Sequence, residues 1–291
     1  MTKKAIILAG GTGTRLFPAT RALSKQLMPV YDKPMIYYPL STIMLAGIQD
    51  ILIISTPRDL PLFQELLGDG SQWGLSLSYA PQPQQNGLAE AFIIGESFIN
   101  GDKVALILGD NLFYGQGLEE LLRQGATNSK GASVFAYRVA NPQSYGVIKY
   151  DAHKQPVDFI EKPKNPPSSW VLTGLYFYDQ QVVDIAKSLN PSPRGELEIT
   201  DINKAYLTKK QIEVMRLGRG YAWLDTGTHD SLASATEFVR LIEARQNIKI
   251  GCPEEIAFKR GLIDAEQVLK IAHESGETPY ASYLKRLIES E

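Results

Sequence analysis

Three glycines and two basic residues near the N-terminus form the part of this sequence best suited to chemistry. The segment Leu8-Ala9-Gly10-Gly11-Thr12-Gly13-Thr14-Arg15-Leu16 follows the apolar residues 4–8 and precedes Ser24-Lys25-Gln26. Glycines let a chain leave a buried strand steeply and turn its amide N–H groups toward an anion. Arg15 and Lys25 add positive charge beside those amides. The segment therefore predicts a binding site for a nucleotide triphosphate.

Two common phosphate-binding templates do not fit this loop. The dinucleotide fingerprint requires a glycine where the chain has Leu16, and a P-loop requires Gly-Lys-Ser/Thr where Gly13 is followed by Thr14 and Arg15. A tight turn without a ligand is the alternative for the glycines alone, and the nearby basic residues argue against it.

Asp110 and Asp225 are candidate ligands for Mg²⁺. Asp110 follows the buried apolar residues 104–108, so its carboxylate is expected in the cleft above the sheet. Mg²⁺ typically takes one or two protein carboxylates and completes its shell with phosphate and water, and Asp225 supplies the second. For Asp110 alone, capping of a following helix is an equally good interpretation.

Two further segments offer charges for a phosphorylated sugar. Lys162 offers a compact charge for a phosphate, and Glu161 can accept hydrogen bonds from sugar hydroxyls. Arg194, before Gly195-Glu196-Leu197-Glu198, can hold a phosphate through two N–H groups. Taken alone, a Glu-Lys pair before a proline is more often a solvated turn. The Arg194 segment has the same ambiguity, with a surface loop that leads into a helix as its alternative.

The sequence lacks the usual signs of nucleophilic or zinc-dependent catalysis. His153, His229 and His273 have no partners at a recognisable spacing, and neither Gly-x-Ser-x-Gly nor His-Glu-x-x-His occurs. Attack by a phosphate monoester on an α-phosphate needs neither, because the second pKa of such an ester is about 6 and its oxygen is already ionised. Positioning and charge neutralisation then suffice.

Composition narrows the class of protein. A formal net charge of −2 gives no reason to expect nucleic acid as a partner. Cys252 is the sole cysteine, so the sequence offers neither a disulfide framework nor a thiolate metal cluster. The chain starts without a signal-like apolar region, and no apolar run approaches the ~18 residues of a membrane span. We expect a cytoplasmic protein with no membrane partner.

Apolar runs that alternate with helical patterns predict an α/β fold with a Rossmann-like, mostly parallel central sheet flanked by helices. A smaller, partly antiparallel sugar-binding sheet and a helical C-terminal region complete this fold. The first part is read as strands over residues 4–8, 50–55, 75–79 and 104–108 and helices over 34–47, 60–67 and 88–98. The second part is read as strands over residues 134–137, 146–150, 157–160 and 175–178, and as helices near 232–242 and 279–288.

These elements suggest a division of the chain. We expect an α/β core over residues 1–227, with a nucleotide-binding part to about 130 and a sugar-binding part over 131–227. Residues 228–291 form the helical C-terminal region, packed on the core and at a subunit interface. No internal repeat or low-complexity linker interrupts the chain.

The motifs together resemble those of the sugar-1-phosphate nucleotidyltransferases. The resemblance covers essentially the whole chain and rests on residues 8–16, 24–29, 31–41, 109–111, 195–201 and 223–229. It implies a Mg²⁺-dependent transfer of a thymidylyl group from dTTP to glucose 1-phosphate, giving dTDP-glucose and pyrophosphate. That product leads to dTDP-deoxysugars such as dTDP-rhamnose and so to carbohydrates such as lipopolysaccharide.

The resemblance also assigns roles to single residues. Catalysis is assigned to Arg15, Lys25, Asp110, Lys162 and Arg194, and the metal to Asp110 and Asp225. Nucleotide contacts are assigned to Gly10, Gly11, Gly13, Thr14, Arg15, Lys25, Gln26, Gln82, Gly87 and Asp110, of which Gln26, Gln82 and Gly87 meet the thymine. Sugar contacts are assigned to Tyr145, Gly146, Glu161, Lys162, Val171, Gly174, Arg194 and Trp223.

By the same resemblance the protein is a homotetramer, a dimer of dimers, with feedback by a dTDP-sugar at a second site. The matching residues are Tyr114, Gly115, Gly218, Arg219, Cys252 and Glu255. Two alternatives stay open: the same chemistry with UTP or another sugar 1-phosphate, and a non-catalytic sensor of sugar nucleotides. A single methyl group separates thymine from uracil and is worth only ~1–3 kcal/mol of discrimination.

Overall fold

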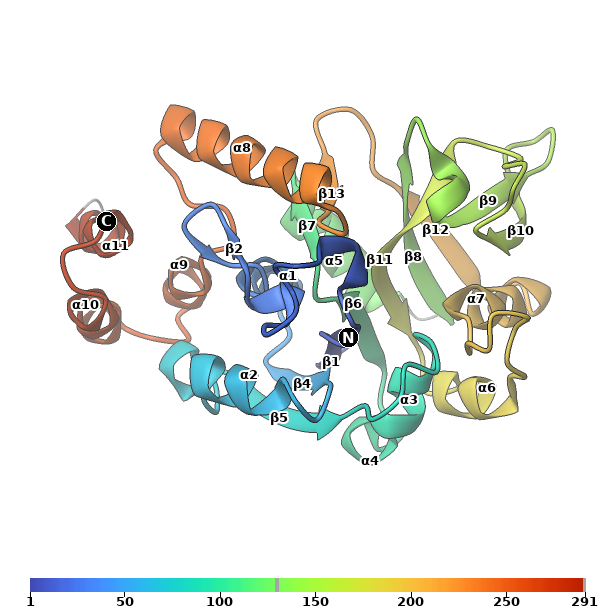
Figure 1. Cartoon of the computed structure of the whole chain (residues 1–291), viewed down its shortest axis with the longest axis horizontal. Helices are drawn as coiled ribbons and strands as arrows, with labels where there is room; N and C mark the ends of the chain where they lie inside the picture. Colours follow the sequence, from blue (N-terminus) through green and yellow to red (C-terminus); the bar gives the residue numbers. More distant parts are fainter. Residues whose placement is uncertain (129–130, 290–291) are drawn as a thin grey trace.

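The computed structural model describes residues 1–128 and 131–289, and its centre is a nine-stranded sheet. Seven strands follow the order β10-β9-β11-β6-β1-β4-β5, and β8 pairs with both β11 and β12 (Figure 1). The strands are β1 Lys4–Leu8, β4 Asp50–Ser55, β5 Ser76–Pro81, β6 Val104–Leu108, β8 Ala132–Arg138, β9 Gly146–Tyr150, β10 Pro156–Glu161, β11 Trp170–Tyr178 and β12 Ile212–Arg216.

The sheet has a parallel part and an antiparallel part. Strands β6, β1, β4 and β5 are parallel, and β11 joins β6 in the antiparallel direction. The carboxyl ends of β1 and β6 therefore lie side by side, with Leu8 opposite Leu108. In such sheets, ligands bind beyond these ends.

Different helices cover the two faces of this sheet. Ala5 and Ile7 of β1 enter one apolar cluster with α1 Tyr37–Leu45, α2 Leu60–Leu67 and α5 Leu118–Thr127. Ile6 and Leu8 enter the opposite cluster, which is completed by α3 Glu90–Ile94, α6 Val182–Ser188 and α7 Ile199–Thr208. A strand that is buried on both faces reads as an unbroken apolar run, which explains the pattern of residues 4–8.

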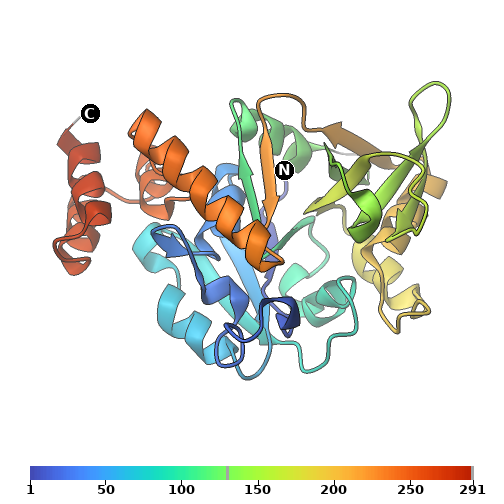
Figure 2. The ribbon, with the colours of Figure 1, turned by 45° about the horizontal axis from the view of Figure 1, so that its top comes forward.

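Two small sheets and a helical tail surround the core. Strands β7 Asn111–Tyr114 and β13 Ala222–Asp225 form one antiparallel pair, and β2 Pro29–Val30 and β3 Lys33–Pro34 form the other. Helix α8 His229–Gln246 packs against β13 and β2, and Figure 2 shows it crossing the molecule in front of the strands. Beyond it follow α9 Pro253–Lys259, α10 Ala265–Glu274 and α11 Pro279–Glu289.

The predicted fold class is confirmed. The antiparallel strands expected over residues 134–178 are present, and they continue the parallel sheet instead of standing apart from it. The last helix has the expected start, because the Thr278 hydroxyl accepts a hydrogen bond from the amide of Ala281 at 3.1 Å. The proposed domain boundaries stay a prediction.

Two predicted helices differ from the structure. The helix expected over residues 34–47 begins only at Tyr37, because Pro34 belongs to β3 and the Met35 amide bonds to the carbonyl of Met28. The helix expected over residues 88–98 is two helices, α3 and α4 Glu96–Ile99, which meet at Gly95. A Cβ at Gly95 would lie 2.9 Å from the Ile6 side chain, so the chain approaches β1 too closely for a larger residue.

None of the helices in residues 1–128 and 131–289 is long and apolar enough to cross a membrane.

Candidate active site

The glycine loop lies beyond β1 and adopts backbone conformations that favour glycine. Gly11 has φ of 115° and Gly13 has φ of 59°, both in the left-handed region. The Thr20 hydroxyl donates to the Gly13 carbonyl at 2.7 Å, and a Cβ at Gly13 would lie 3.1 Å from that side chain, a tight contact. The loop then closes in a 3-10 turn, Thr14–Leu16, that carries Arg15 toward the C-terminal part of the core.

Arg15 and Asp225 come from distant parts of the sequence and meet here. A Cβ at Gly227 would lie 2.8 Å from a guanidinium nitrogen of Arg15, so the arginine packs against the turn after β13. The same guanidinium favours ionisation of Asp225. The predicted triphosphate-binding arginine thus lies beside the second predicted metal ligand.

A small cavity opens between the glycine loop, β5 and the loop before α3. Its volume is about 180 Å³, less than the ~300 Å³ at the lower end of sites for drug-sized ligands, so it suits a nucleobase instead of a whole nucleotide. Its lining includes seven of the predicted nucleotide contacts: Gly10, Gly11, Lys25, Gln26, Gln82, Gly87 and Asp110. The remaining lining residues are Leu8, Gln85, Leu88, Leu108 and Glu196.

Gln26 is held by the loop itself. It is buried, its side-chain carbonyl accepts a hydrogen bond from Ser24 at 2.6 Å, and its Nε2 lies 3.4 Å from the Gly10 carbonyl. Its side chain also contacts Gly109, where a Cβ would lie 3.0 Å from Gln26 Cγ. The residue joins the glycine loop to the end of β6.

Lys25 forms an ion pair with Asp110 directly beyond the ends of β1 and β6. Burial disfavours ionisation of Asp110, but the Lys25 ammonium and the Asn111 amide outweigh it and hold the pKa of that carboxyl below its usual range. Burial and the nearby Asp110 charge raise the pKa of Asp225. The two carboxylates therefore lie close enough to repel each other.

The carboxylates of Asp110 and Asp225 fit a hard divalent cation. A cation between Asp110 and Asp225 would relieve their repulsion, and Lys25 and Arg15 already lie within electrostatic range of Asp225. No group of three or more His, Cys, Asp or Glu side chains able to hold a metal occurs in the described ranges. Two carboxylates would leave positions on the ion open for phosphate oxygens and water, as is usual for Mg²⁺ bound together with a phosphate.

Asn111 connects a predicted metal ligand, Asp110, with two predicted sugar contacts. Its Nδ2 donates to Asp110 at 2.9 Å, while its Oδ1 accepts from the Gly174 amide at 2.9 Å and from the Trp223 indole at 2.6 Å. A Cβ at Gly174 would lie 2.6 Å from that oxygen, so only glycine fits there. Asn111 lies within one of the sequence motifs, but the sequence alone predicted no role for it.

Tyr145 links the predicted sugar contacts with Asp225, one of the two predicted metal ligands. Its ring lies 5.3 Å from that of Trp223, and its hydroxyl hydrogen-bonds to Asp225. Gly146 lies beside Glu161, since a Cβ there would be 3.4 Å from Glu161 Oε2. Val171 is fully buried and pairs with Val147, so its side chain belongs to the core.

Glu161, Lys162 and Arg194 gather in one cluster. Lys162 Nζ and Arg194 Nη1 each lie 3.6 Å from Glu161 Oε1. Burial raises the pKa of Glu161, with a further contribution from Glu198, and the two cations oppose the shift. Arg194 also pairs with Glu196 at 2.9 Å, and Glu196 lines the small cavity. The predicted sugar-phosphate cations thus adjoin the predicted nucleotide contacts.

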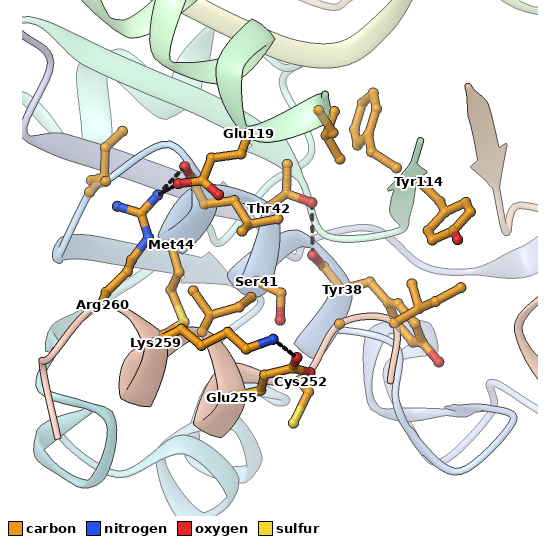
Figure 3. A pocket seen from close by; sticks show the side chains of 18 of the residues that line it. Tyr38, Ser41, Thr42, Met44, Tyr114, Glu119, Cys252, Glu255, Lys259 and Arg260 are labelled. Atoms are coloured by element: carbon orange, nitrogen blue, oxygen red, sulfur yellow. Dashed lines mark hydrogen bonds and ion pairs between the residues drawn. The ribbon is translucent and has the colours of Figure 1, made fainter. Parts of the chain in front are cut away.

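A second, larger hollow lies away from these residues, between α1, β7, α5 and α9 (Figure 3). Its volume is about 1110 Å³, and its lining contains four of the predicted regulatory residues: Tyr114, Gly115, Cys252 and Glu255. Gly218 and Arg219 are outside its lining, although the neighbouring Gly220 carbonyl would lie 3.0 Å from a Cβ at Gly115. The larger hollow is not the candidate active site, because Asp110, Lys25 and the glycine loop line the smaller cavity.

Comparison with known proteins identifies the family of this chain. The family model described as nucleotidyl transferase matches residues 4–241. A glucose-1-phosphate thymidylyltransferase of Xanthomonas campestris pv. campestris is 55% identical over 98% of this chain and 97% of its own. That of Mycolicibacterium smegmatis is 56% identical over 99% of this chain and 100% of its own.

Solved structures give the same result. A Bacillus anthracis structure named as a glucose-1-phosphate thymidylyltransferase, in complex with sucrose, aligns with a TM-score of 0.76 and 38% identity, covering 82% of this chain and 96% of that one. A UDP-glucose pyrophosphorylase complexed with UDP-glucose aligns with a TM-score of 0.73 and 25% identity, covering 83% of this chain and 100% of that one. On these grounds the chain belongs to the nucleotidyl transferase family and groups with the glucose-1-phosphate thymidylyltransferases within it.

Proposed function

We propose that this enzyme transfers the thymidylyl group of dTTP to glucose 1-phosphate and releases pyrophosphate. The observation that carries the proposal is the meeting of three groups beyond the ends of β1 and β6. A glycine loop with Arg15 and Lys25 adjoins the carboxylates Asp110 and Asp225, and the Glu161–Lys162–Arg194 cluster lies on the sugar side.

On the nucleotide side, the base enters the cavity between Gly10, Gln82 and Gly87. The triphosphate follows the glycine loop, where Arg15 and Lys25 hold it. These cations stabilise the negative charge that develops on the departing pyrophosphate.

Asp110 and Asp225 would hold Mg²⁺. When bound, this ion neutralises phosphate charge and orients the nucleotide. Lys25 pairs with Asp110 in the structure, so its ammonium lies where it would also contact phosphate oxygens of a bound triphosphate.

On the sugar side, Lys162 and Arg194 hold the phosphate of glucose 1-phosphate, and Glu161 accepts hydrogen bonds from sugar hydroxyls. An ionised oxygen of this phosphate attacks the α-phosphorus of dTTP in line with the bond to the β-phosphate. The new P–O bond forms as the old one breaks, and the electron pair leaves with pyrophosphate. The reaction requires no general base, since the nucleophile is already ionised at neutral pH.

Pyrophosphate release from glucose 1-phosphate tests this proposal. The assay compares dTTP, UTP, ATP, CTP and GTP with Mg²⁺ and after chelation of the metal. We expect release to be strongest with dTTP and to stop on chelation. Folded protein that releases nothing with any nucleotide, yet binds dTDP-glucose, would establish the sensor alternative instead.

Use of UTP is the second candidate, and the UDP-glucose pyrophosphorylase alignment favours it. The two bases differ by one methyl group, which is worth only about 1–3 kcal/mol in an apolar contact. A kcat/KM for UTP equal to or above that for dTTP would replace the substrate while leaving the mechanism in place.

The large hollow suits a regulatory nucleotide-sugar, which would be a dTDP-sugar made from the product. Its volume of about 1110 Å³ is sufficient for a whole nucleotide-sugar, and Tyr114, Gly115, Cys252 and Glu255 line it. Inhibition by dTDP-rhamnose that saturating dTTP does not relieve would support this site. Purely competitive inhibition would place the inhibitor in the active site alone.

We extend the proposal to a cytoplasmic homotetramer, arranged as a dimer of dimers, that supplies deoxysugars for surface carbohydrate such as lipopolysaccharide. The helical region around α8 to α11 is the candidate subunit contact. Light scattering of the purified protein measures the assembly, and a monomeric mass would reject it.

A further inference from the structure

Gln82 is held in one orientation by a carboxylate that lies behind it. The side chain follows β5, is 5% exposed, and lines the base cavity. Its Nε2 donates to Glu90 Oε2 at 2.7 Å and lies 3.5 Å from the carbonyl oxygen of Gly87. Both of these groups only accept hydrogen bonds, so the NH₂ end of the Gln82 amide must face them.

The carbonyl end of the same amide faces the glycine loop. A Cβ added at Gly10 would lie 3.0 Å from Gln82 Oε1, which places this oxygen against the glycine loop that lines the cavity. Within residues 1–128 and 131–289, the recorded hydrogen bonds of the Gln82 side chain all involve Nε2. The carbonyl oxygen is therefore available to a bound base.

Glu90 is itself fixed in place. Asn86 Nδ2 donates to Glu90 Oε1 at 2.7 Å, so one carboxylate accepts from two amides, one on each oxygen. Glu90 begins α3, and the loop before it is tied down by the Leu197 amide, which donates to the Asn86 carbonyl at 2.6 Å. Both Glu90 oxygens therefore accept hydrogen bonds, and the Gln82 amide can meet Glu90 only through its NH₂ group.

The Gln82 carbonyl oxygen would select bases by whether N3 carries a hydrogen. Thymine and uracil carry an N3–H that can donate to Gln82 Oε1, whereas N3 of cytosine is an acceptor and would face that oxygen with a lone pair. A site built to hydrogen-bond a donor strongly rejects an analogue that lacks it, because its buried polar group is left unpaired.

We propose that Glu90 is a positioning residue that sets base selectivity: it fixes the Gln82 amide so that the cavity accepts keto pyrimidines and rejects cytosine. The inference rests on the proposed function for the placement of the base at Gln82. Glu90 is outside the residues that line the base cavity, so it would act through Gln82.

The test compares kcat/KM for dTTP, dUTP and 5-methyl-dCTP in the wild type and Glu90→Leu. Thymine and 5-methylcytosine share the methyl group and differ on the base-pairing edge, while dUTP lacks only the methyl group. Without Glu90 the Gln82 amide can turn, so we expect the dTTP to 5-methyl-dCTP ratio to fall by about tenfold or more. The dTTP to dUTP ratio should stay within about twofold of the wild type, because orientation of Gln82 does not affect the methyl contact.

Two variants sharpen the comparison. Glu96→Leu is the matched control, since Glu96 pairs with Lys187 on the surface, and it should keep the wild-type ratios. The double variant Asn86→Asp/Glu90→Gln keeps the net charge and should also keep the selectivity. The carboxylate introduced at position 86 can only accept, so the amide introduced at position 90 would donate to it and offer its carbonyl to Gln82. Glu90→Ala replaces Glu90→Leu if the larger side chain prevents folding.

A proportional loss with all three nucleotides in Glu90→Leu would overturn the inference and leave Glu90 a structural residue. So would equal use of dTTP and 5-methyl-dCTP by the wild type, or a selectivity in Asn86→Asp/Glu90→Gln as low as in Glu90→Leu. Failure of the proposed function looks different, because the wild type would then release no pyrophosphate with dTTP. In that case the dissociation constants of the same nucleotides, measured by calorimetry, still decide the role of Glu90.

Discussion

Asn111 accepts a hydrogen bond from the Trp223 indole nitrogen at 2.6 Å, across the small sheet that joins β7 to β13. In that sheet Asp225 lies opposite Asn111, the residue directly after Asp110. The two predicted metal carboxylates are therefore placed by neighbouring strands, and a buried amide fastens these strands to the sugar side.

Replacing Asn111 should impair both stability and sugar binding. Asn111→Ala leaves the Gly174 amide and the Trp223 indole without their acceptor, at a cost of about 1–3 kcal/mol for each buried donor. We expect a lower Tm and a higher KM for glucose 1-phosphate, measured by thermal unfolding and steady-state kinetics. Thr173→Val is the control, because no partner is recorded for the buried Thr173 hydroxyl within the described part of the chain. An unchanged KM in Asn111→Ala would separate this amide from the sugar site.

Replacing Asp110 should abolish turnover and preserve the fold. Asp110→Asn keeps the size of the side chain and removes a charge that faces both Lys25 and Asp225. We expect kcat to fall by about 10²-fold or more, as for loss of one strong electrostatic group, with an unchanged circular dichroism spectrum. Near-normal activity would remove Asp110 from the metal site.

Gly87 should tolerate no side chain. Its φ is 106°, and a Cβ there would lie 2.4 Å from the Leu197 carbonyl oxygen. Gly87→Ala should displace the loop and weaken dTTP binding by about tenfold or more, a loss of at least ~1.4 kcal/mol. Calorimetric titration measures this. Gly101→Ala is the matched control, since Gly101 also has positive φ, at 75°, and nothing lies within 4 Å of a Cβ there. Equal effects of the two variants would attribute the loss to backbone strain alone.

Acid should weaken the ion-pair cluster of Asp32, Lys33, Glu243 and Lys249. Burial disfavours ionisation of Asp32, but Lys33 and Lys249 outweigh it and lower the pKa of that carboxyl. A carboxyl with a lowered pKa in the folded state stabilises the protein above its unfolded pKa of about 3.9, and this contribution is lost as pH falls through the folded value.

Asp32→Asn measures that contribution. We expect the variant to be less stable than the wild type by about 1 kcal/mol at pH 7, and the difference to shrink as pH falls below about 3.9 and through the lowered pKa of the folded state. Urea unfolding across this range gives both curves. A difference that stays constant with pH would attribute the effect to packing and not to charge.

The sequence predicted the parallel half of the fold well, for a physical reason. Strands buried on both faces, such as residues 4–8 and 104–108, are unbroken apolar runs, and the structure places β1 and β6 at those residues. Strand β11 was predicted only over residues 175–178 but begins at Trp170, because Thr173 and Gly174 interrupt its apolar pattern. Gly174 is required there by the close approach of Asn111, a contact between distant segments that no local pattern reveals.

For the candidate site, too, the sequence revealed the residues with a local pattern and missed those that act through distant contacts. Residues with a charge or a glycine at a strand end, such as Asp110 and Gly11, could be selected from the sequence, and the structure gathers them. Asn111 and Glu90 could not, because each acts through hydrogen bonds to segments far from its own motif or through another side chain. The roles assigned to the single site residues stay predictions until the variants are measured.

The central strand β6 pairs with β1 on one side and with β11 on the other, so one continuous sheet runs from the nucleotide half to the sugar half. Main-chain hydrogen bonds across a shared sheet oppose movement of one half against the other. The spacing between the two predicted phosphate sites is then set by the sheet itself. New substrates can then be accommodated by changing the loops at the rim, while the separation that the chemistry needs is inherited unchanged.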